Sequence, residues 1–150
     1  MLIEYRSSLD PELAALVTFQ NRELTEAGLG TGSRMFRPQD DVEHLIGVVN
    51  GRAVACGAWR ALEDGVAEFQ RMYVRPAYRG RGLARQMIVA IEEEALAAER
   101  PVVRLETWSF LPAAIALYQS SGYRRIPVAG AYAGDPRRVR FEKRLPALVF

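Results

Sequence analysis

Apolar and polar residues along the first half of the chain follow the spacing of one helix and then of several strands. Residues 11–27 carry apolar side chains at helical spacing, with Asp10 as a cap and Pro11 at the first helical position, which predicts a helix. Strands are predicted where short apolar runs lie between turn residues, at 2–6, 44–49, 52–62 and 66–74. The connections within 44–74 are too short for a crossover, and Asn50-Gly51 is a hairpin signal, so these strands should form an antiparallel meander.

The order of elements changes after residue 74. Helices are predicted at 82–98 and 112–121, and strands at 102–107, 123–126 and 139–145. Because a strand, a helix and a strand follow one another, the strands at 66–74 and 102–107 are expected to be parallel neighbours. The predicted fold class is therefore α/β with a mixed sheet.

The composition is that of a globular protein and excludes several classes. The chain has 150 residues, of which 49% are hydrophobic and 25% charged, so one domain over 1–150 is expected. The net charge is only +2 and no basic block is present, which disfavours nucleic-acid binding. Neither a signal peptide nor a membrane span is evident, so we expect a cytoplasmic protein without a membrane partner.

Cysteine and histidine are too scarce for a metal site. Cys56 is the one cysteine, which rules out an internal disulfide and a Cys-based zinc cluster. It lies in an apolar strand and is expected in the core. His44 begins a strand, with no cysteine and no paired-carboxylate geometry beside it in the sequence, so it is interpreted as structural and no metal is expected.

Residues 75–84 join a strand to a helix through a loop rich in glycine and arginine. The first turn of a helix has unpaired N–H groups and the positive end of the dipole, so it binds phosphate well. Gly80 and Gly82 let the backbone approach an anion, and Arg79 and Arg81 add positive charge. The loop lacks the lysine of a Walker motif and the third glycine of a Rossmann fingerprint. The residues predict a phosphate or pyrophosphate ligand, and a plain chain-reversing turn is the alternative.

The same loop resembles a motif of a known family. Arg79-Gly80-Arg81-Gly82-Leu83-Ala84 is similar to the (Gln/Arg)-x-x-Gly-x-(Gly/Ala) motif of the GNAT superfamily of acetyl-CoA-dependent N-acetyltransferases. Residues 72–76 are similar to the strand that precedes this loop in the family, and 113–123 to its A-I-x-L-Y-x-x-x-G-F/Y segment. The order and spacing agree, over roughly residues 44–145. The resemblance implies a central mixed twisted sheet of about six to seven strands, flanked by about four helices.

Acetyl-CoA is the cofactor that this resemblance implies. In the family, two central parallel strands splay apart around the pantetheine arm, and here they are 66–74 and 102–107. The arm would pair with backbone groups of Met72 and Val74, and the pyrophosphate would lie on the amides between Arg79 and Ala84. The implied cofactor-binding residues are Met72, Val74, Arg79, Gly80, Arg81, Gly82, Leu83 and Ala84.

The implied reaction is direct attack of an amine on the thioester of acetyl-CoA in a ternary complex. A general base takes the proton of the amine, and a general acid gives one to the departing thiolate. The backbone N–H of Val74 would stabilise the oxyanion. Tyr118 is the candidate acid, since a phenol is protonated at neutral pH. Packing of its ring in the core is the alternative. Glu68 is the candidate base, with Glu106 as a second candidate.

For Glu68 the alternative is an ion-paired strand carboxylate, with Arg71 or Arg104 as its partner. The acceptor pocket is expected from the loops 28–40 and 127–136, from Trp108, and from Trp59 or Arg60. Leu111 stands where many relatives have a polar residue.

Arginines in the two loops suggest what the acceptor is. Candidates for binding a carboxylate or phosphate of the acceptor are Arg34, Arg37, Arg137 and Arg138. We expect Arg34 and Trp108 in particular to contact the substrate. This indicates a small-molecule amine with an anionic group, such as an amino acid. A protein acceptor (a lysine or an N-terminus) and a non-catalytic acyl-CoA-binding sensor are the alternatives. A homodimer is compatible with the family.

Overall fold

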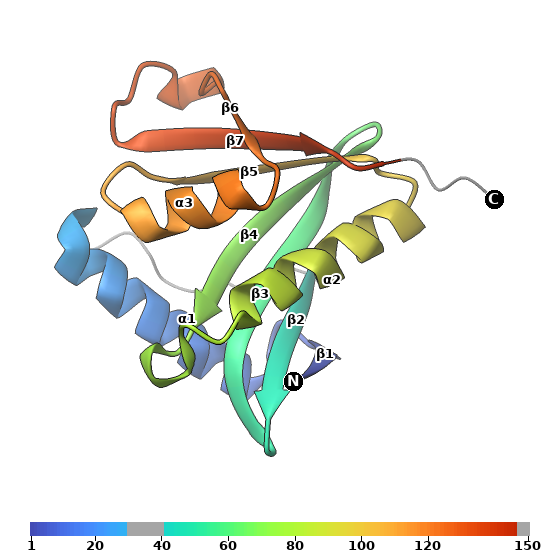
Figure 1. Cartoon of the computed structure of the whole chain (residues 1–150), viewed down its shortest axis with the longest axis vertical. Coiled ribbons are helices and arrows are strands. Elements are labelled where there is room, and N and C mark those ends of the chain that lie inside the picture. The colour runs from blue at the N-terminus through green and yellow to red at the C-terminus, as the bar shows by residue number, and fades with distance from the viewer. Residues whose placement is uncertain (30–40, 147–150) are drawn as a thin grey trace.

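A seven-stranded mixed sheet forms the centre of the computed structural model, which describes residues 1–29 and 41–146 (Figure 1). Its strand order is β1-β2-β3-β4-β5-β7-β6. The strands are β1 (Leu2–Arg6), β2 (Val42–Val49), β3 (Arg52–Glu63), β4 (Val66–Val74), β5 (Val102–Trp108), β6 (Arg124–Ile126) and β7 (Arg138–Arg144). Strands β4 and β5 are parallel, as predicted, and the other pairs are antiparallel.

Three α-helices flank the sheet over the described residues, which is one fewer than we expected. They are α1 (Pro11–Leu24), α2 (Leu83–Ala97) and α3 (Pro112–Ser120), together with the short turns η1 (Thr25–Leu29), η2 (Pro76–Tyr78) and η3 (Gly130–Tyr132). As predicted, Asp10 caps α1, because its carboxylate accepts a hydrogen bond of 2.9 Å from the N–H of Leu13. Helix α1 passes directly into the π-turn η1, and Gly28 then leaves the helical conformation with a φ of 129°, so helical structure ends at about residue 27, as predicted.

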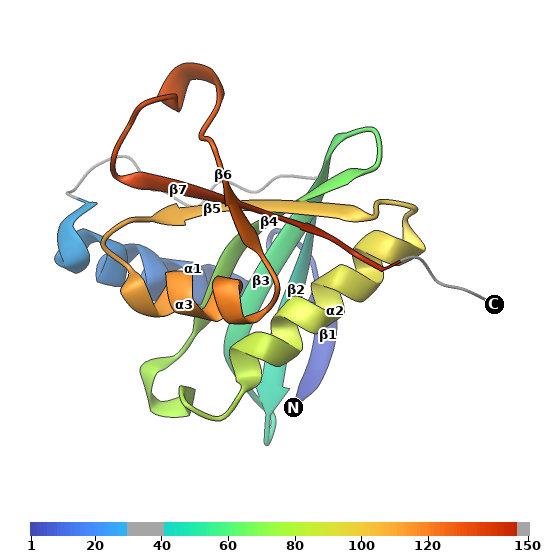
Figure 2. The ribbon, with the colours of Figure 1, turned by 45° about the horizontal axis from the view of Figure 1, so that its top comes forward.

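The helices cover both faces of the sheet (Figure 2). Apolar residues of α2 and α3 pack on one face with those of the central strands, and apolar residues of α1 pack on the other face. Helix α2 contributes Leu83, Met87, Ile88, Ile91 and Ala95, while α1 contributes Leu13, Leu16 and Val17. The result is a three-layer arrangement in which the sheet is buried from both sides.

A β-bulge interrupts β4 at Arg71. Opposite Gly57 of β3, β4 has the two residues Arg71 and Met72, and Arg71 adopts a φ of 57°. The extra residue reverses the alternation of side chains along the strand. Phe69 therefore packs on the α2 side, whereas Tyr73, four residues later, packs on the α1 side.

Strands β4 and β5 separate just before this bulge. Their pairing runs from Val66 and Val102 to Phe69 and Leu105, and β5 then continues along β7 alone. Figure 1 shows the two strands diverging toward the ends of α1 and α3. The N–H of Arg75 bonds to Val54 of β3, so by alternation the backbone groups of Met72 and Val74 face away from β3, toward the opening.

Candidate active site

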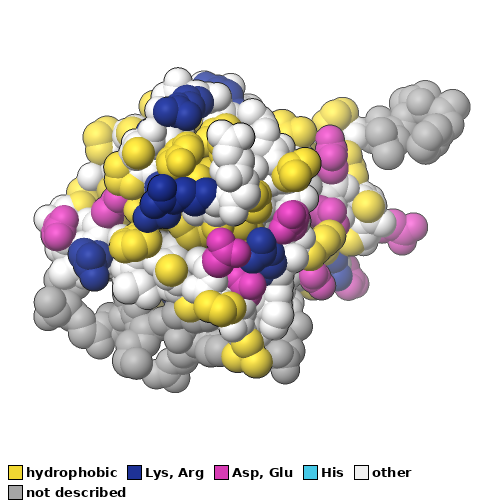
Figure 3. All heavy atoms as spheres, turned by 90° about the horizontal axis from the view of Figure 1, so that it is seen from below, with side chains coloured by type: hydrophobic (Ala, Val, Ile, Leu, Met, Phe, Trp, Pro, Cys, Tyr) yellow, Lys and Arg dark blue, Asp and Glu magenta, His cyan; other side chains and the backbone are white. Residues whose placement is uncertain are grey.

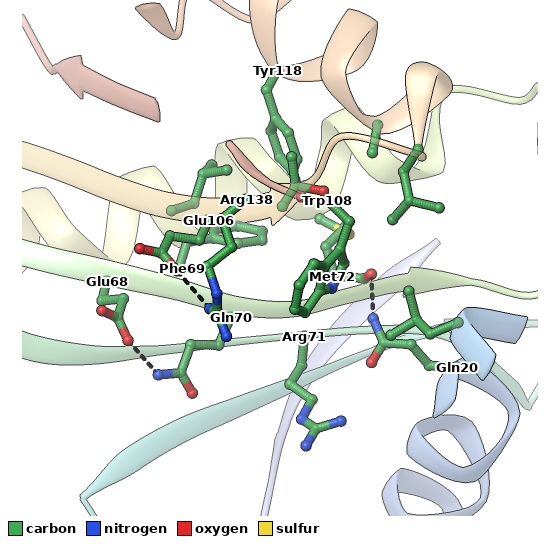
Figure 4. A pocket seen from close by; sticks show the side chains of 15 residues that line it. Gln20, Glu68, Phe69, Gln70, Arg71, Met72, Glu106, Trp108, Tyr118 and Arg138 are labelled. Carbon is green, nitrogen blue, oxygen red and sulfur yellow. Dashed lines mark hydrogen bonds and ion pairs between the residues drawn. The ribbon is translucent and has the colours of Figure 1, made fainter. Parts of the chain in front are cut away.

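A cavity of about 330 Å³ occupies the place where β4 and β5 part. Its walls come from α1, β4, β5, α3 and the start of β7. The lining residues are Gln20, Leu24, Glu68, Phe69, Gln70, Arg71, Met72, Leu105, Glu106, Thr107, Trp108, Leu111, Ala114, Tyr118 and Arg138. Of the residues proposed from the sequence as catalytic, cofactor-binding or substrate residues, the structure brings six together in this cavity (Figure 4): Glu68, Met72, Glu106, Trp108, Tyr118 and Arg138.

Tyr118 extends from α3 into the cavity. Its ring packs against Phe69, Tyr123 and Phe141, with centroids 6.0–6.3 Å apart, and the side chain also lines the cavity, so packing in the core does not remove it from the site. Burial raises the pKa of the Tyr118 phenol above its usual value. The hydroxyl therefore stays protonated and remains a proton donor at neutral and mildly alkaline pH.

Glu68 lines the same cavity as an ion-paired carboxylate. Its Oε1 accepts hydrogen bonds from Arg60 Nε at 3.1 Å and from Gln70 Nε2 at 2.5 Å. The expected partners, Arg71 and Arg104, were wrong, because the bulge turns Arg71 toward α1 and Arg104 pairs with Glu63 and Glu142. Both bonds go to Oε1, and neither involves Oε2, the second carboxylate oxygen.

Arg71 is a cation in the cavity wall that the sequence did not single out as a ligand residue. Its Nη1 donates to Asn21 Oδ1 at 3.0 Å, and no Asp or Glu within the described residues forms an ion pair with it. Burial lowers the pKa of this guanidinium. Figure 4 shows the group on the side of β4 away from Tyr118. A half-buried cation without a carboxylate partner is expected to attract an anion.

The last turns of α1 bond to the unpaired part of β4. Gln20 Nε2 donates to the carbonyl of Met72 at 2.8 Å, and the Glu23 carboxylate accepts from the Tyr73 hydroxyl at 2.9 Å. Glu23 also pairs with Arg79 at 2.7 Å, and Arg79 Nε donates to the carbonyl of Val74 at 2.8 Å. Both carbonyls are thus occupied, so a ligand between the strands can still bond to the N–H groups of Met72 and Val74.

The loop before α2 presents bare backbone amides. Gly80 and Gly82 have φ values of 78° and 77°, and a Cβ placed on either would meet nothing within 4 Å. Unlike α1, helix α2 has no side-chain cap, and its first helical bond is from Gln86 N to Gly82 O. The amides of Leu83, Ala84 and Arg85 precede that bond. This is the open, positively polarised helix end that a pyrophosphate fits.

The arginines of this loop have other contacts than we expected. Arg79 forms an ion pair with Glu23 and donates a hydrogen bond to the carbonyl of Val74, so its guanidinium stabilises the end of β4. Arg81 lies over the Tyr78 ring at 5.2 Å. Figure 3 shows basic, acidic and apolar groups interspersed on the described part of the face at this end of the molecule. The amides at the start of α2 are thus the donors of this loop that have neither a helical bond nor a side-chain cap.

The far wall of the cavity is a stack built on Arg138. Its guanidinium lies 4.9 Å from the Trp108 ring and 3.5 Å from the Tyr132 ring, and it pairs with Glu106 at 3.2 Å. Trp108 therefore lines the cavity, and Glu106, the second candidate base, lies in an ion pair with Arg138. Arg137 pairs instead with Asp135.

Other sequence proposals lie outside the cavity. Trp59 is in the hydrophobic core, and Arg60 reaches the site only through Glu68. Arg34 and Arg37 lie outside the described residues. Cys56 is buried in the core as expected, and burial raises its pKa to about 12, so it offers no thiolate for an acetyl-cysteine route.

His44 is buried, and burial lowers its pKa. Within residues 1–29 and 41–146, no three His, Cys, Asp or Glu side chains are grouped to hold a metal ion. In the same ranges no helix has the length and apolar character needed to cross a membrane.

Comparison with known proteins decides the family. A model of the "Acetyltransferase (GNAT) domain" matches residues 40–125 of the chain. The chain belongs to the GNAT acetyltransferase family. It is 36% identical over 106 residues to an IAA acetyltransferase of Azospirillum brasilense, a match that covers 70% of this chain and 69% of that protein.

Solved structures of GNAT proteins share the fold. A candidate acyl-CoA N-acyltransferase of Klebsiella pneumoniae superposes with a TM-score of 0.83 at 32% identity, covering 96% of this chain and 97% of the other. A GNAT acetyltransferase of Elizabethkingia anophelis with acetyl-CoA bound has a TM-score of 0.72 at 14% identity, over 96% and 97% of the two chains. The protein is thus an acetyl-CoA-dependent N-acetyltransferase, and its uncapped α2 terminus and parted strands suit that cofactor.

Proposed function

We propose that this GNAT enzyme acetylates the primary amine of a small molecule that also carries an acidic group, such as an amino acid. The observation that carries the proposal is Arg71, a half-buried cation in the cavity wall whose described partner is the neutral amide of Asn21. A carboxylate would receive a charge-assisted, forked pair of hydrogen bonds from it. The strained φ of Arg71 is consistent with a functional role, since such conformations concentrate at ligand sites.

The cofactor would lie along the end of β4. The amides from Gly80 to Ala84 would take the pyrophosphate, and the N–H groups of Met72 and Val74 would pair with the pantetheine arm. Arg79 would act by fixing the strand end through Val74 and Glu23. The contribution of Arg81 would be limited to its charge.

The chain supplies an acid and a base on opposite sides of the parted strands. Acetyl-CoA brings an acetyl thioester, whose C–S bond breaks as the N–C bond to the amine forms. Glu68 would take the amine proton through Oε2, directly or through a water, and Tyr118 would donate its proton to the departing sulfur. Trp108 and Arg138 would limit the size of the acceptor.

Acceptors in matched pairs test the proposal. Each pair is an amino acid and the amine left when its carboxylate is removed, assayed by thiol release from acetyl-CoA. We expect the wild type to favour the acid at least about tenfold in kcat/KM, since charge-assisted hydrogen bonds are worth this much. Arg71→Gln should abolish the preference and leave the acetyl-CoA KM unchanged. A wild type that prefers polyamines, or an unchanged preference in Arg71→Gln, would contradict the proposal.

A further inference from the structure

Gln20 presents an unsatisfied oxygen at the α1 wall of the cavity. Its Nε2 donates to the carbonyl of Met72 at 2.8 Å (Figure 4). Its Oε1 is buried from solvent and has no hydrogen-bond partner in the part of the chain that the structure describes. Buried side-chain oxygens are normally hydrogen-bonded, so an exception at a cavity wall points to a donor that belongs to the ligand.

The chemistry of the amide fixes which atom is left over. The Met72 carbonyl can only accept, so the nitrogen of the Gln20 amide must face it. Turning the amide over would set two oxygens against each other and break the bond. The remaining group is therefore an acceptor, and it can be satisfied only by an N–H or an O–H.

We propose that Gln20 Oε1 accepts an N–H of the acceptor amine and so holds the attacking nitrogen beside β4. This proposal rests on the proposed function, because it assigns a second group of the same acceptor. Gln20 and Asn21 are neighbours on α1, and they bond to the neighbouring residues Met72 and Arg71 of β4. The amine and the carboxylate of the acceptor are thus received at adjacent positions, which favours a short amino acid.

A neutral amide oxygen suits this task. It binds either an ammonium or an amine, yet it has no affinity for the proton itself. The proton is left to Glu68, whose Oε2 takes part in neither of that carboxylate's bonds to Arg60 and Gln70. Gln20 is accordingly a binding and positioning residue, and its loss should raise the KM of the amine.

Two substitutions distinguish the role of the Gln20 amide oxygen from that of its amide nitrogen. Gln20→Met removes both polar groups at similar length, whereas Gln20→Glu keeps an acceptor and loses the donor to Met72. We expect the amine KM to rise about tenfold or more in Gln20→Met and to stay within about threefold in Gln20→Glu, as for one hydrogen bond to a charged group. Acetyl-CoA affinity, measured by calorimetry, should be equal in the two variants. Thermal melting checks that both are folded.

Assaying each variant with both members of each acceptor pair, the amino acid and the amine without its carboxylate, distinguishes this proposal from the proposed function. Loss of the Gln20 oxygen should weaken the acid and the plain amine alike, whereas loss of Arg71 should weaken the acid alone. An equal rise in amine KM for Gln20→Met and Gln20→Glu, or no rise in either, would overturn the role of Gln20. Absence of any acid preference would overturn the role of Arg71 and leave the Gln20 comparison valid with plain amines.

Discussion

The substitution Gly82→Glu is expected to raise the KM for acetyl-CoA by about a hundredfold or more, because it sets a carboxylate against the pyrophosphate. Gly82 is the N-cap of α2, and open space surrounds the position of its missing side chain. The new charge would therefore stand in solvent at the helix end, where the anion is bound. The amine KM should change little. Steady-state kinetics with thiol release measures both constants.

Gly51→Glu is the matched control. Gly51 has the same φ of 77°, and a Cβ there would likewise meet nothing within 4 Å, but it lies in the β2–β3 hairpin. Both substitutions impose the same left-handed strain, about 1–2 kcal/mol. If the two variants have the same acetyl-CoA KM, backbone strain explains the loss and the loop does not bind the cofactor through its charge environment.

Phenylalanine in place of Tyr118 is expected to lower kcat about a hundredfold, the usual contribution of a general acid. The substitution keeps the ring that packs against Phe69 and Phe141, so the fold and the acetyl-CoA KM should be retained. Because burial raises the pKa of Tyr118, its proton is lost only above the usual phenol range. The wild-type kcat should thus show no decline from this group between neutral pH and pH ~9.

Tyr123→Phe provides the comparison for Tyr118→Phe. Tyr123 lies in the same aromatic cluster, 6.0 Å from Tyr118 between ring centroids, but its hydroxyl donates to Glu92 at 2.9 Å. It does not line the cavity. The control should keep the wild-type kcat even if its melting temperature falls. A normal kcat in Tyr118→Phe would show that another group or water, and not Tyr118, is the general acid.

Regular elements were predictable because each has a local cause. The caps, the Asn50-Gly51 hairpin and the periods of apolar residues placed the helices and strands close to where they lie. The parallel contact of β4 and β5 followed from the short βαβ unit. Glycine ended the first helix where predicted, since Gly28 leaves the helical conformation after the π-turn η1.

Site residues on regular elements were easier to predict than those that depend on the bulge. On a regular strand, Arg71 would share a face with Phe69, and no local signal predicts the reversal. Gln20 resembles any polar residue of an amphipathic helix, and only the packing of α1 brings it to Met72.

Charge partners were the least predictable feature. Glu92 belongs to the run Glu92-Glu93-Glu94, which has the composition of a solvated helix face, yet it bonds to Tyr123 and Lys143. These pairs join residues distant in sequence, and sequence spacing does not encode such contacts.

The proposed binding mode of the cofactor is tested most directly by titrating acetyl-CoA into ¹⁵N-labelled protein and following the backbone amide resonances. In that mode the pyrophosphate lies on the amides from Gly80 to Ala84, and the pantetheine arm pairs with Met72 and Val74. We expect these amides to undergo the largest shifts and to saturate together at one binding stoichiometry. Saturable binding that leaves the amides of 80–84 unmoved would contradict this binding mode, as would the absence of binding.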